Sequence, residues 1–429
     1  MKYNFITRVE GEGKVYIYIR NGKVSKVSIE IPEAPRFFEY IVRGKKVDYI
    51  PDIVSRICGF CGSSYVLVAV KAFEKCLSVK VPEEVDELRK VIHLAERVKS
   101  HVLHIFLLNL PDFIRTRNTF ELRLVNEDVF KNIMKLVAYS SNIMNLLGGR
   151  FHNVVNIRIG GVYKAPSRDE AAKILKLAEE SLELLKPLAD IVLSLKTIPS
   201  DNLNKPYLLL SYENEYPHMS DEIIFSSTAG EERISVGDFE HVISVEQVGG
   251  KNALLYKYRG QSYIVGPLAR FNKAFPKLHG EVRDMLKNYG WLPPLSDVRQ
   301  QIIARIAEVY DALLTIRRFF EEYREPAITS VEERRLDVDK ATCIAAVEAP
   351  RGILYHRFVV DNQLRVLECN IITPTAQNLA SMEELSLELL NRKFSGEVDE
   401  AIARKYVEEV VRAFDPCISC SVHVYLLKS

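Results

Sequence analysis

Alternating apolar and polar positions predict small β regions in three parts of the chain. Residues 13–31 have the pattern of two strands around Asn21-Gly22, a dipeptide that suits a two-residue hairpin turn. Short β-like runs interrupted by Gly and Pro fill residues 206–264. Three more strands are predicted near the C-terminal end, at 343–347, 353–360 and 364–372. β structure is therefore expected at the N-terminus, in the middle and before the last helices.

Apolar residues at helical spacing predict a bundle of long helices. The first spans Glu83–Asn109, between Pro82 and Pro111, and the second runs from 122 to 147. A third begins with a capping box at Ser167 and contains Pro187 as a kink or break. Further helices are predicted at 297–323, 382–392 and 398–413. These patterns predict a mainly helical α+β fold in one composite domain, since no repeat or long linker divides the chain.

Composition excludes several classes of function. The 429 residues carry 58 Lys+Arg and 57 Asp+Glu, a net charge of +1, so no basic excess supports nucleic-acid binding. Apolar runs are short and interrupted by polar residues, which predicts no membrane span. The N-terminus has no apolar signal core, so a cytoplasmic protein is expected. Scarce Gln beside abundant Lys and Glu favours a thermophilic source.

Four of the seven cysteines form two CxxC pairs, Cys58/Cys61 and Cys417/Cys420. Four thiolates are a typical ligand set for a soft or borderline metal. In a structural zinc ribbon such pairs lie about 15–20 residues apart, whereas these lie near opposite ends of the chain. A redox dithiol at each end stays open, although neither pair sits in a βαβ pattern. The remaining cysteines are expected to be small buried core residues: Cys76, Cys343 and Cys369.

The residues around both pairs resemble the large subunit of nickel–iron hydrogenases. The first pair lies in Arg56-Ile-Cys-Gly-Phe-Cys-Gly62, and the second in Asp415-Pro-Cys-Ile-Ser-Cys-Ser-Val-His423. Within the family, the C-terminal motif and Ile372-Thr-Pro-Thr375 are most similar to the cytosolic NAD(P)-linked branch, which includes sulfhydrogenases. Further matching motifs follow in the family's order: Thr7–Gly11, Arg36–Glu39, Ser100-His101 through Asp112, Gly148–Arg150, Gly160-Gly161 and Glu348–Gly352.

This resemblance implies a nickel–iron centre. Cys58 and Cys417 would be terminal nickel ligands, and Cys61 and Cys420 would bridge nickel and iron. The iron would carry CO and CN⁻ ligands, which maturation proteins must supply. The resemblance also implies two groups beside the centre. Arg351, which follows Pro350, would lie over the open metal position, and the Thr375 hydroxyl would donate to a cyanide.

The resemblance further implies a route for protons. Asp112 and Asp415 would pair with Arg351, and Glu10 would relay a proton from the terminal thiolate towards solvent. An arginine is almost always protonated, so Arg351 would orient the substrate and Cys417 would take the proton. The sequence leaves open whether Arg351 is itself the base.

A second metal site is implied near the C-terminus. Glu39, His423 and a backbone carbonyl near Ile371 would hold Mg²⁺, or Fe²⁺ in some relatives, together with water. A maturation peptidase would cleave after His423. The mature domain would then span residues 1–423, and the extension 424–429 would be removed.

Several residues near the motifs have other expected roles. Tyr65 stands where the family usually has a His that donates to a bridging sulfur, so altered redox tuning is expected. His101 and His104 are spaced like a metal pair, but by resemblance they are packing and hydrogen-bonding residues. We treat His93 and His152 as structural.

The chain cannot carry electrons away alone. Three isolated cysteines cannot hold a four-thiolate iron–sulfur cluster, and no Gly-rich dinucleotide fingerprint is present. We therefore expect an iron–sulfur small (delta) subunit, with ferredoxin-like and FAD- and NAD(P)-binding subunits. The expected activity is reversible cleavage of H₂, with sulfur or polysulfide reduction open. Alternatives are a hydrogen sensor of the same fold, a structural zinc protein and a non-catalytic structural subunit.

Overall fold

A β-hairpin opens the fold, as the alternating pattern predicts. The computed structural model describes residues 4–34, 36–114, 116, 118–247, 252–328 and 336–421. Strands β2 (Lys14–Arg20) and β3 (Lys23–Glu30) pair antiparallel. Asn21 and Gly22 between them have φ of 52° and 73°, as a two-residue hairpin turn requires. The two-residue strand β1 (Asn4–Phe5) pairs with β2.

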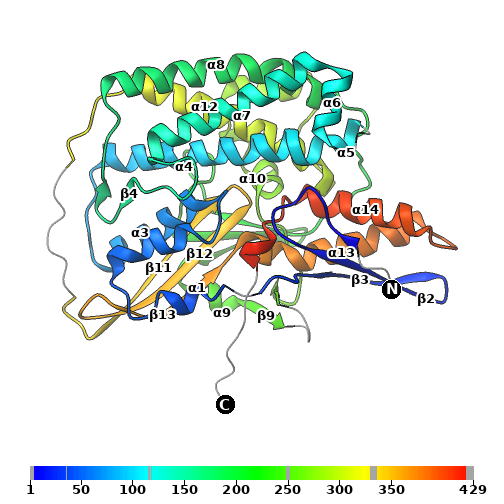
Figure 1. The fold of residues 1–429 in the computed structure, drawn as a ribbon. Coiled ribbons are helices and arrows are strands. Elements are labelled where there is room, and N and C mark those ends of the chain that lie inside the picture. Colours follow the sequence, from blue (N-terminus) through cyan, green and yellow to red (C-terminus); the bar gives the residue numbers. More distant parts are fainter. Residues whose placement is uncertain are drawn as a thin grey trace.

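Four long helices form one layer of the molecule (Figure 1). They are α4 (Glu83–Leu103), α7 (Glu127–Gly148), α8 (Arg168–Leu193) and α12 (Gln301–Glu321). Helix α12 packs on both α4 and α8, and α7 packs on the same two helices. The bundle predicted from helical spacing is therefore confirmed.

A three-stranded antiparallel sheet lies beneath this layer (Figure 1). Its strands are β11 (Lys340–Ala349), β12 (Gly352–Asp361) and β13 (Val366–Ile372). Helix α3 (Gly62–Cys76), which the sequence did not predict, packs on β11 and β12. The tight turn between β11 and β12 consists of Pro350 and Arg351, so the sheet presents Arg351 at its end.

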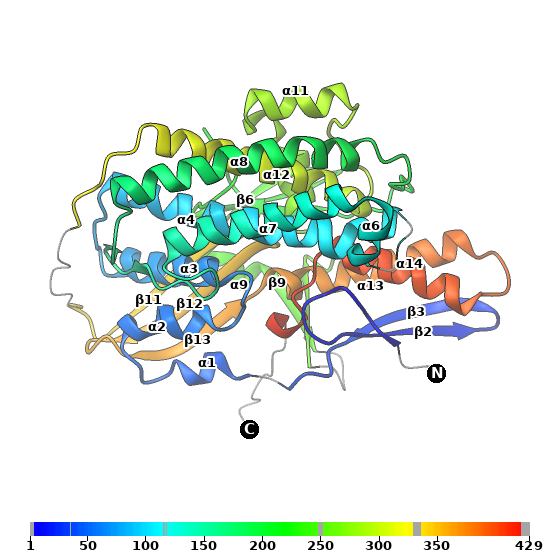
Figure 2. The ribbon, with the colours of Figure 1, turned by 45° about the horizontal axis from the view of Figure 1, so that its top comes forward.

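The middle of the chain forms the predicted β-rich region. One sheet contains β6 (Tyr207–Leu210), β7 (Glu222–Ser227) and β8 (Gly230–Ser235), and a hairpin pairs β9 (Ile243–Gln247) with β10 (Leu254–Tyr258). Shorter elements elsewhere in the chain are α1 (Phe38–Ile41), α2 (Ile50–Ser55), α9 (Phe239–Val242), α10 (Pro267–Ala274), α11 (Gly280–Asn288), β4 (Ile157–Arg158) and β5 (Gly161–Val162). Figure 2 shows α11 outside the helical layer.

The two ends of the chain meet at the site. Helices α13 (Pro374–Lys393) and α14 (Glu400–Ala413) lead to the 3₁₀ helix Ile418–Ser421. That 3₁₀ helix lies beside the N-terminal segment in both views (Figures 1 and 2). Glu10 and Cys417 form a parallel β-bridge, and the Ile418 N–H donates to the Glu10 carbonyl at 3.0 Å.

Three predicted helix boundaries are wrong, and one of them is the start of α13, which lies at Pro374 and not at 382. The first helix does not stop before Pro111: a π-helical turn, His104–Asn109, follows α4 and leads into α5 (Leu110–Ile114). The second prediction covers two helices, because Asn126 ends α6 (Thr119–Val125) and caps α7. Helix α8 continues through Pro187, so of the predicted kink or break the break is absent, since packing on α7 and α12 outweighs one lost backbone hydrogen bond.

The isolated cysteines Cys343 and Cys369 are buried in the core as predicted, whereas Cys76 is only partly buried and a disulfide was not foreseen. Cys76 and Cys343 form a disulfide that joins α3 to β11, with their Cα atoms 5.1 Å apart. They are 267 positions apart in sequence and meet only because α3 packs on the sheet. Cys369 is a free buried thiol, as predicted. Within the described ranges, no helix is long and apolar enough to cross a bilayer.

Candidate metal centre

Cysteine sulfurs from both ends of the chain gather in one buried cluster. The Sγ atoms of Cys58, Cys417 and Cys420 all lie within 4.8 Å of one another. Cys58 Sγ is 3.4 Å from Cys417 Sγ, and Cys417 and Cys420 are in direct sulfur–sulfur contact. The fold therefore brings the two CxxC pairs together, which the sequence could only suggest.

Cys61 completes the cluster from the start of α3. It is the N-cap residue of that helix, and its N–H donates to Cys58 Sγ at 3.3 Å. The hydrogen bond between the two side chains lowers the pKa of Cys58 and raises that of Cys61 well above its usual value.

The chemistry of this donor set fits a metal. All four side chains are at most 6% exposed, so thiolates here have little access to solvent counterions. Buried negative charges this close repel unless a cation lies among them. Soft thiolates select soft or borderline ions such as nickel, zinc and iron. The residues present are therefore suited to hold such a centre.

Arg351 lies directly against the cluster. Its Nη1 donates to Cys61 Sγ at 2.9 Å and its Nη2 to Asp415 Oδ1 at 3.0 Å, while its Nε donates to the Asp415 carbonyl at 2.6 Å. The side chain is buried, with its guanidinium 5.7 Å from the Phe60 ring centroid. Burial lowers the pKa of Arg351, but the charges of Asp415 and Cys61 outweigh burial and raise that pKa above its usual value.

Asp415 is held in an uncommon backbone conformation, with φ of 54°. Non-glycine residues in this region are strained and need support from their surroundings. Arg351 provides part of that support through two hydrogen bonds. The predicted pairing of Asp415 with Arg351 is therefore present in the structure.

Asp112 does not contact Arg351, contrary to expectation. Its two carboxylate oxygens accept from Arg412, from Nη2 at 2.8 Å and from Nε at 2.9 Å, and Arg8 also donates to Oδ1. The π-helical turn before α5 displaces Asp112 from the position that a continuous helix would give it. Asp112 therefore joins the N-terminal segment to the end of α14.

Glu10 contacts the segment that carries the second cysteine pair. Its Oε1 accepts from the Ser419 hydroxyl at 2.8 Å, and its Oε2 accepts from the Ser419 N–H at 3.2 Å. The same hydroxyl lies 3.1 Å from Glu33 Oε1. Gly11 makes this approach possible: its φ is +78°, and a Cβ there would lie 2.6 Å from Ser419 Oγ.

Thr375 and Pro350 also lie at the centre. The Thr375 hydroxyl accepts from the Cys417 N–H at 3.0 Å, and this contact fixes the start of the second cysteine pair. Pro350 precedes Arg351 in the turn between β11 and β12, and its carbonyl accepts from Arg270 at 3.0 Å.

The expected second metal site is described in part. Glu39 Oε1 accepts from the Ile371 N–H at 2.8 Å, so these two predicted residues are adjacent. Burial raises the pKa of Glu39 above its usual value. His423 and the extension 424–429 lie outside the described residues.

The four histidines take the expected hydrogen-bonding roles. His101 Nε2 pairs with Glu308 at 2.7 Å, and His104 Nε2 lies 2.7 Å from the Arg412 carbonyl. His93 lies between Ser64 and His218, at 2.9 and 3.0 Å, and His152 contacts the Gly59 carbonyl.

Tyr65 is buried at the metal side of α3. Its ring lies against His356, with centroids 5.6 Å apart. Burial, followed by the charges of Cys58 and Cys61, raises the pKa of the phenol well above its usual value. Among the described contacts no hydrogen bond joins Tyr65 to a sulfur, so Tyr65 does not take over the donor role of the family's usual His.

His356 gives a testable dependence of stability on pH. Burial lowers the pKa of His356 to about 3, and neither ring nitrogen has a partner among the described residues. Below pH 6.5 the unfolded chain binds a proton that the folded chain excludes, so stability falls as pH falls from about 6.5 towards 3. Between pH 7 and pH 4 this histidine should cost roughly 3 kcal/mol.

The measurement is chemical denaturation of the purified protein at both pH values. His356→Leu should remove this part of the loss, because an apolar side chain suits a site without hydrogen-bond partners. His241→Leu, at an exposed position, is the control and should leave the loss unchanged. Equal acid losses in native protein and His356→Leu would contradict the account.

Sequence reasoning missed charged side chains buried behind the cysteine loop. Glu96 accepts from the N–H groups of Ser63 and Ser64, at the first turn of α3. Lys99 donates to the Phe151 carbonyl. Both lie within the apolar face of α4. The sequence did contain a signal for them: both are charged residues at core-facing positions of a predicted helix. Such residues are rarely buried without a partner, so they could have been predicted to take part in a buried polar network.

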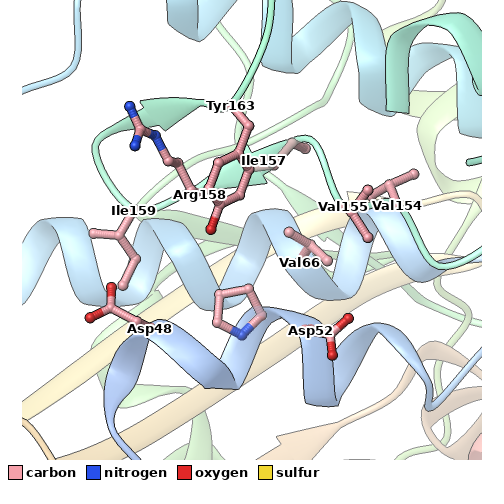
Figure 3. A pocket seen from close by; sticks show the side chains of 10 residues that line it. Asp48, Asp52, Val66, Val154, Val155, Ile157, Arg158, Ile159 and Tyr163 are labelled. Carbon is pink, nitrogen blue, oxygen red and sulfur yellow. The ribbon is translucent and has the colours of Figure 1, made fainter. Parts of the chain in front are cut away.

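A cavity of about 300 Å³ lies apart from this centre. Figure 3 shows Asp48 and Asp52 on one side, Tyr163 and Arg158 on the other, and Val66 of α3 between them. None of the predicted site residues lines it, so the chemistry expected of the chain does not lie there.

Comparisons with known proteins identify the family to which this chain is similar. The model of the family described as nickel-dependent hydrogenase matches residues 36–132 and 255–423. The chain is 33% identical over 417 residues to the alpha chain of sulfhydrogenase 2 from Pyrococcus furiosus, covering 97% of each chain. It is 31% identical over 429 residues to the alpha chain of sulfhydrogenase 1 from the same organism, covering 98% of this chain and 97% of the relative.

Solved structures show the same fold. An NAD⁺-reducing NiFe hydrogenase in its H₂-reduced state superimposes with a TM-score of 0.83 at 22% identity, covering 99% of this chain and 100% of that one. The chain belongs to the nickel-dependent hydrogenase family, as the family match and the relatives show. The predicted α+β large-subunit fold is confirmed.

Proposed function

We propose that this chain is the catalytic subunit of a hydrogenase that interconverts H₂ with protons and electrons. One observation carries the proposal: Arg351 donates to Cys61 Sγ and to Asp415 beside a buried cluster of cysteine sulfurs. A fixed cation beside thiolate ligands can orient a substrate and stabilise the charge that develops on it. Membership of the nickel-dependent hydrogenase family supports the same function.

The four cysteines would hold a nickel–iron centre. Cys58 and Cys417 would be terminal nickel ligands, and Cys61 and Cys420 would bridge the two metals. When bound, such a centre would supply an electrophilic metal for H₂ cleavage, and CO and CN⁻ would complete the ligand set of the iron. Thr375 holds the Cys417 backbone with its hydroxyl oxygen, so the hydroxyl proton stays available for a cyanide.

Arg351 would orient the substrate while Cys417 takes the proton. The raised pKa of Arg351, due to Asp415 and Cys61 acting against burial, keeps the guanidinium charged. Glu10 is bridged to Cys417 through the backbone, and its carboxylate contacts Ser419. A proton would therefore pass from Cys417 to Glu10 and through the Ser419 hydroxyl to the half-buried Glu33.

A second metal would stabilise the C-terminal end of the mature chain. Glu39 and the carbonyl of Ile371, with His423, would bind Mg²⁺ or Fe²⁺, since hard cations prefer oxygen ligands. The adjacency of Glu39 and Ile371 supports this site. Removal of 424–429 by a maturation peptidase would leave His423 as the final residue of a single domain.

Electrons would leave through partner subunits. Of the seven cysteines, four lie in the cluster and two in the disulfide, so Cys369 alone is left. An iron–sulfur small (delta) subunit would take the electrons, and ferredoxin-like and FAD- and NAD(P)-binding subunits would follow. The similarity to the alpha chains of sulfhydrogenases supports a multi-subunit complex with sulfur reduction as a further activity. We place this complex in the cytoplasm, as the sequence led us to expect.

The direct test is hydrogen-dependent reduction of NAD⁺ and NADP⁺ by the anaerobically purified complex. We expect rapid reduction of at least one nucleotide and of a viologen dye. Slow dye reduction with no nucleotide reduction would favour the alternative of a hydrogen sensor. No hydrogen turnover in a complex that contains nickel would contradict the proposed function.

A further inference from the structure

Arg270 makes an unusual set of contacts deep behind the site. It lies on α10 and is completely buried. Its Nε and Nη2 donate to the two carboxylate oxygens of Glu308, both at 2.7 Å, and its Nη1 donates to Glu348 Oε2 at 2.7 Å. The remaining two N–H groups donate to the carbonyls of Ala349, at 3.1 Å, and Pro350, at 3.0 Å. All five guanidinium donors therefore have acceptors.

Two of these acceptors belong to the turn that carries Arg351. Ala349 and Pro350 are the residues immediately before Arg351, and Ala349 forms the last pair of the β11–β12 ladder with Gly352. The orientation of their carbonyls determines the path of the chain through the turn. Arg270 is thus hydrogen-bonded to the backbone of the turn that orients the Arg351 guanidinium towards Cys61 and Asp415.

The segment before α10, Val265 and Gly266, also packs closely against this turn. A Cβ on Gly266 would lie 2.5 Å from the Arg351 carbonyl oxygen, and a Cβ on Gly352 would lie 2.5 Å from a methyl carbon of Val265. Both glycines have positive φ, of 106° and 131°. At Gly266 the backbone lies directly against the Arg351 carbonyl, so the segment that leads into α10 packs closely on the turn.

The acceptors of Arg270 are themselves fixed. Glu308 also accepts from the Tyr216 hydroxyl at 2.8 Å and pairs with His101 at 2.7 Å. Glu348 Oε1 accepts from the Leu210 N–H at 2.8 Å. The guanidinium therefore joins α12 to the end of β11, and its two glutamate acceptors are held by α4, β6 and the segment at Tyr216. The turn is thus held by a rigid frame.

We propose that Arg270 is a positioning residue for Arg351, acting through the Ala349 and Pro350 carbonyls. This inference rests on the proposed function, because it concerns how Arg351 is aimed at the cysteine cluster. Lysine cannot replace Arg270, since one ammonium offers three donors from a single point and cannot reproduce the planar fork. A displaced turn would misplace the Arg351 guanidinium, and small misplacements in catalytic sites cost about 10²-fold in rate.

The test compares Arg270→Lys with a matched control in the intact complex. Arg89→Lys is the control: Arg89 is also fully buried, is bidentate to Glu74 and donates to the carbonyls of Arg158 and Gly161, with no contact to Arg351. We expect Arg270→Lys to keep nickel and iron and to lose roughly 10- to 100-fold in kcat with little change in KM for H₂. Arg89→Lys should lower thermal stability but keep native kcat.

Two readouts separate positioning from general damage. In the Arg351→Lys background, the added Arg270→Lys change should cost less than about threefold, because residues acting as a unit are not additive. Hydrogen–deuterium exchange of a peptide spanning 345–355 should be faster in Arg270→Lys than in native protein, and native-like in Arg89→Lys. A full additional loss in the double variant, or unchanged exchange, would overturn the proposal.

A second variant covers the case in which Arg270→Lys does not mature. Glu348→Gln keeps an oxygen for Arg270 and should lose less kcat than Arg270→Lys while retaining both metals. Loss of metals from both variants would overturn a positioning role, since the network would then be needed for folding alone. A native complex without hydrogen turnover would overturn the proposed function, whereas native kcat in Arg270→Lys would overturn only this inference.

Discussion

Replacing Cys58 or Cys417 with serine is expected to yield a protein without stable nickel. The two sulfurs are 3.4 Å apart in a buried cluster, so both would bind the same ion. A serine hydroxyl stays protonated near neutral pH and is a poor ligand for a soft metal. Nickel per chain, measured by mass spectrometry after anaerobic purification, should fall from about one to near zero.

Cys369→Ser is the matched control for this prediction. Cys369 is a buried free thiol that lies on β13, outside the cluster. We expect nickel content in this variant to equal that of the native protein. Native nickel content in Cys58→Ser, or an equal loss in Cys369→Ser, would remove the basis for the ligand assignment.

Arg351→Lys is expected to retain the metals and lose most turnover. A lysine ammonium cannot reach Cys61 Sγ and both Asp415 acceptors together, as the guanidinium does. Loss of one preorganised donor at a site of developing charge typically costs about 10²–10³-fold in kcat. The measurement is anaerobic hydrogen uptake, corrected for nickel and iron content.

Arg299→Lys provides the control for the arginine substitution. Arg299 is likewise buried and hydrogen-bonded to two carboxylates, Asp297 and Asp201, away from the cysteine cluster. Its replacement should lower stability and leave kcat per nickel unchanged. Native turnover in Arg351→Lys would show that the guanidinium does not take part in the reaction.

Local signals in the sequence predicted much of the fold. Asn21-Gly22 determined a hairpin because both residues tolerate positive φ. Ser167 and Glu170 form the predicted capping box at the start of α8. The end of α4 was not predictable in this way, because a π-helical turn depends on packing around His104–Asn109 and not on a local motif.

The site was predictable only as far as its motifs extend. Both cysteine pairs and Arg351 stand in recognisable contexts, and the structure brings these residues together. The predicted pairing of Asp112 with Arg351 was wrong, because whether Asp112 meets Arg351 or Arg412 depends on tertiary geometry. Long-range side-chain pairing leaves no periodic trace, so the Cys76–Cys343 disulfide was also missed.

Arg270 shows the same limit for buried charge. Its helix was not predicted, and its acceptors Glu308 and Glu348 lie on α12 and β11, far along the chain. Each charged residue taken alone would be assigned to the surface. Only the folded arrangement shows that the three charges are paired in the interior.

The central claim is that the buried cysteines hold a nickel–iron centre. An infrared spectrum of the anaerobically purified native complex tests it most directly, because CO and CN⁻ on a metal absorb where protein groups do not. A nickel–iron centre of this kind should give one CO band and two CN⁻ bands. Absence of these bands in a protein that contains about one zinc per chain would contradict the claim, since the cysteines would then form a structural site.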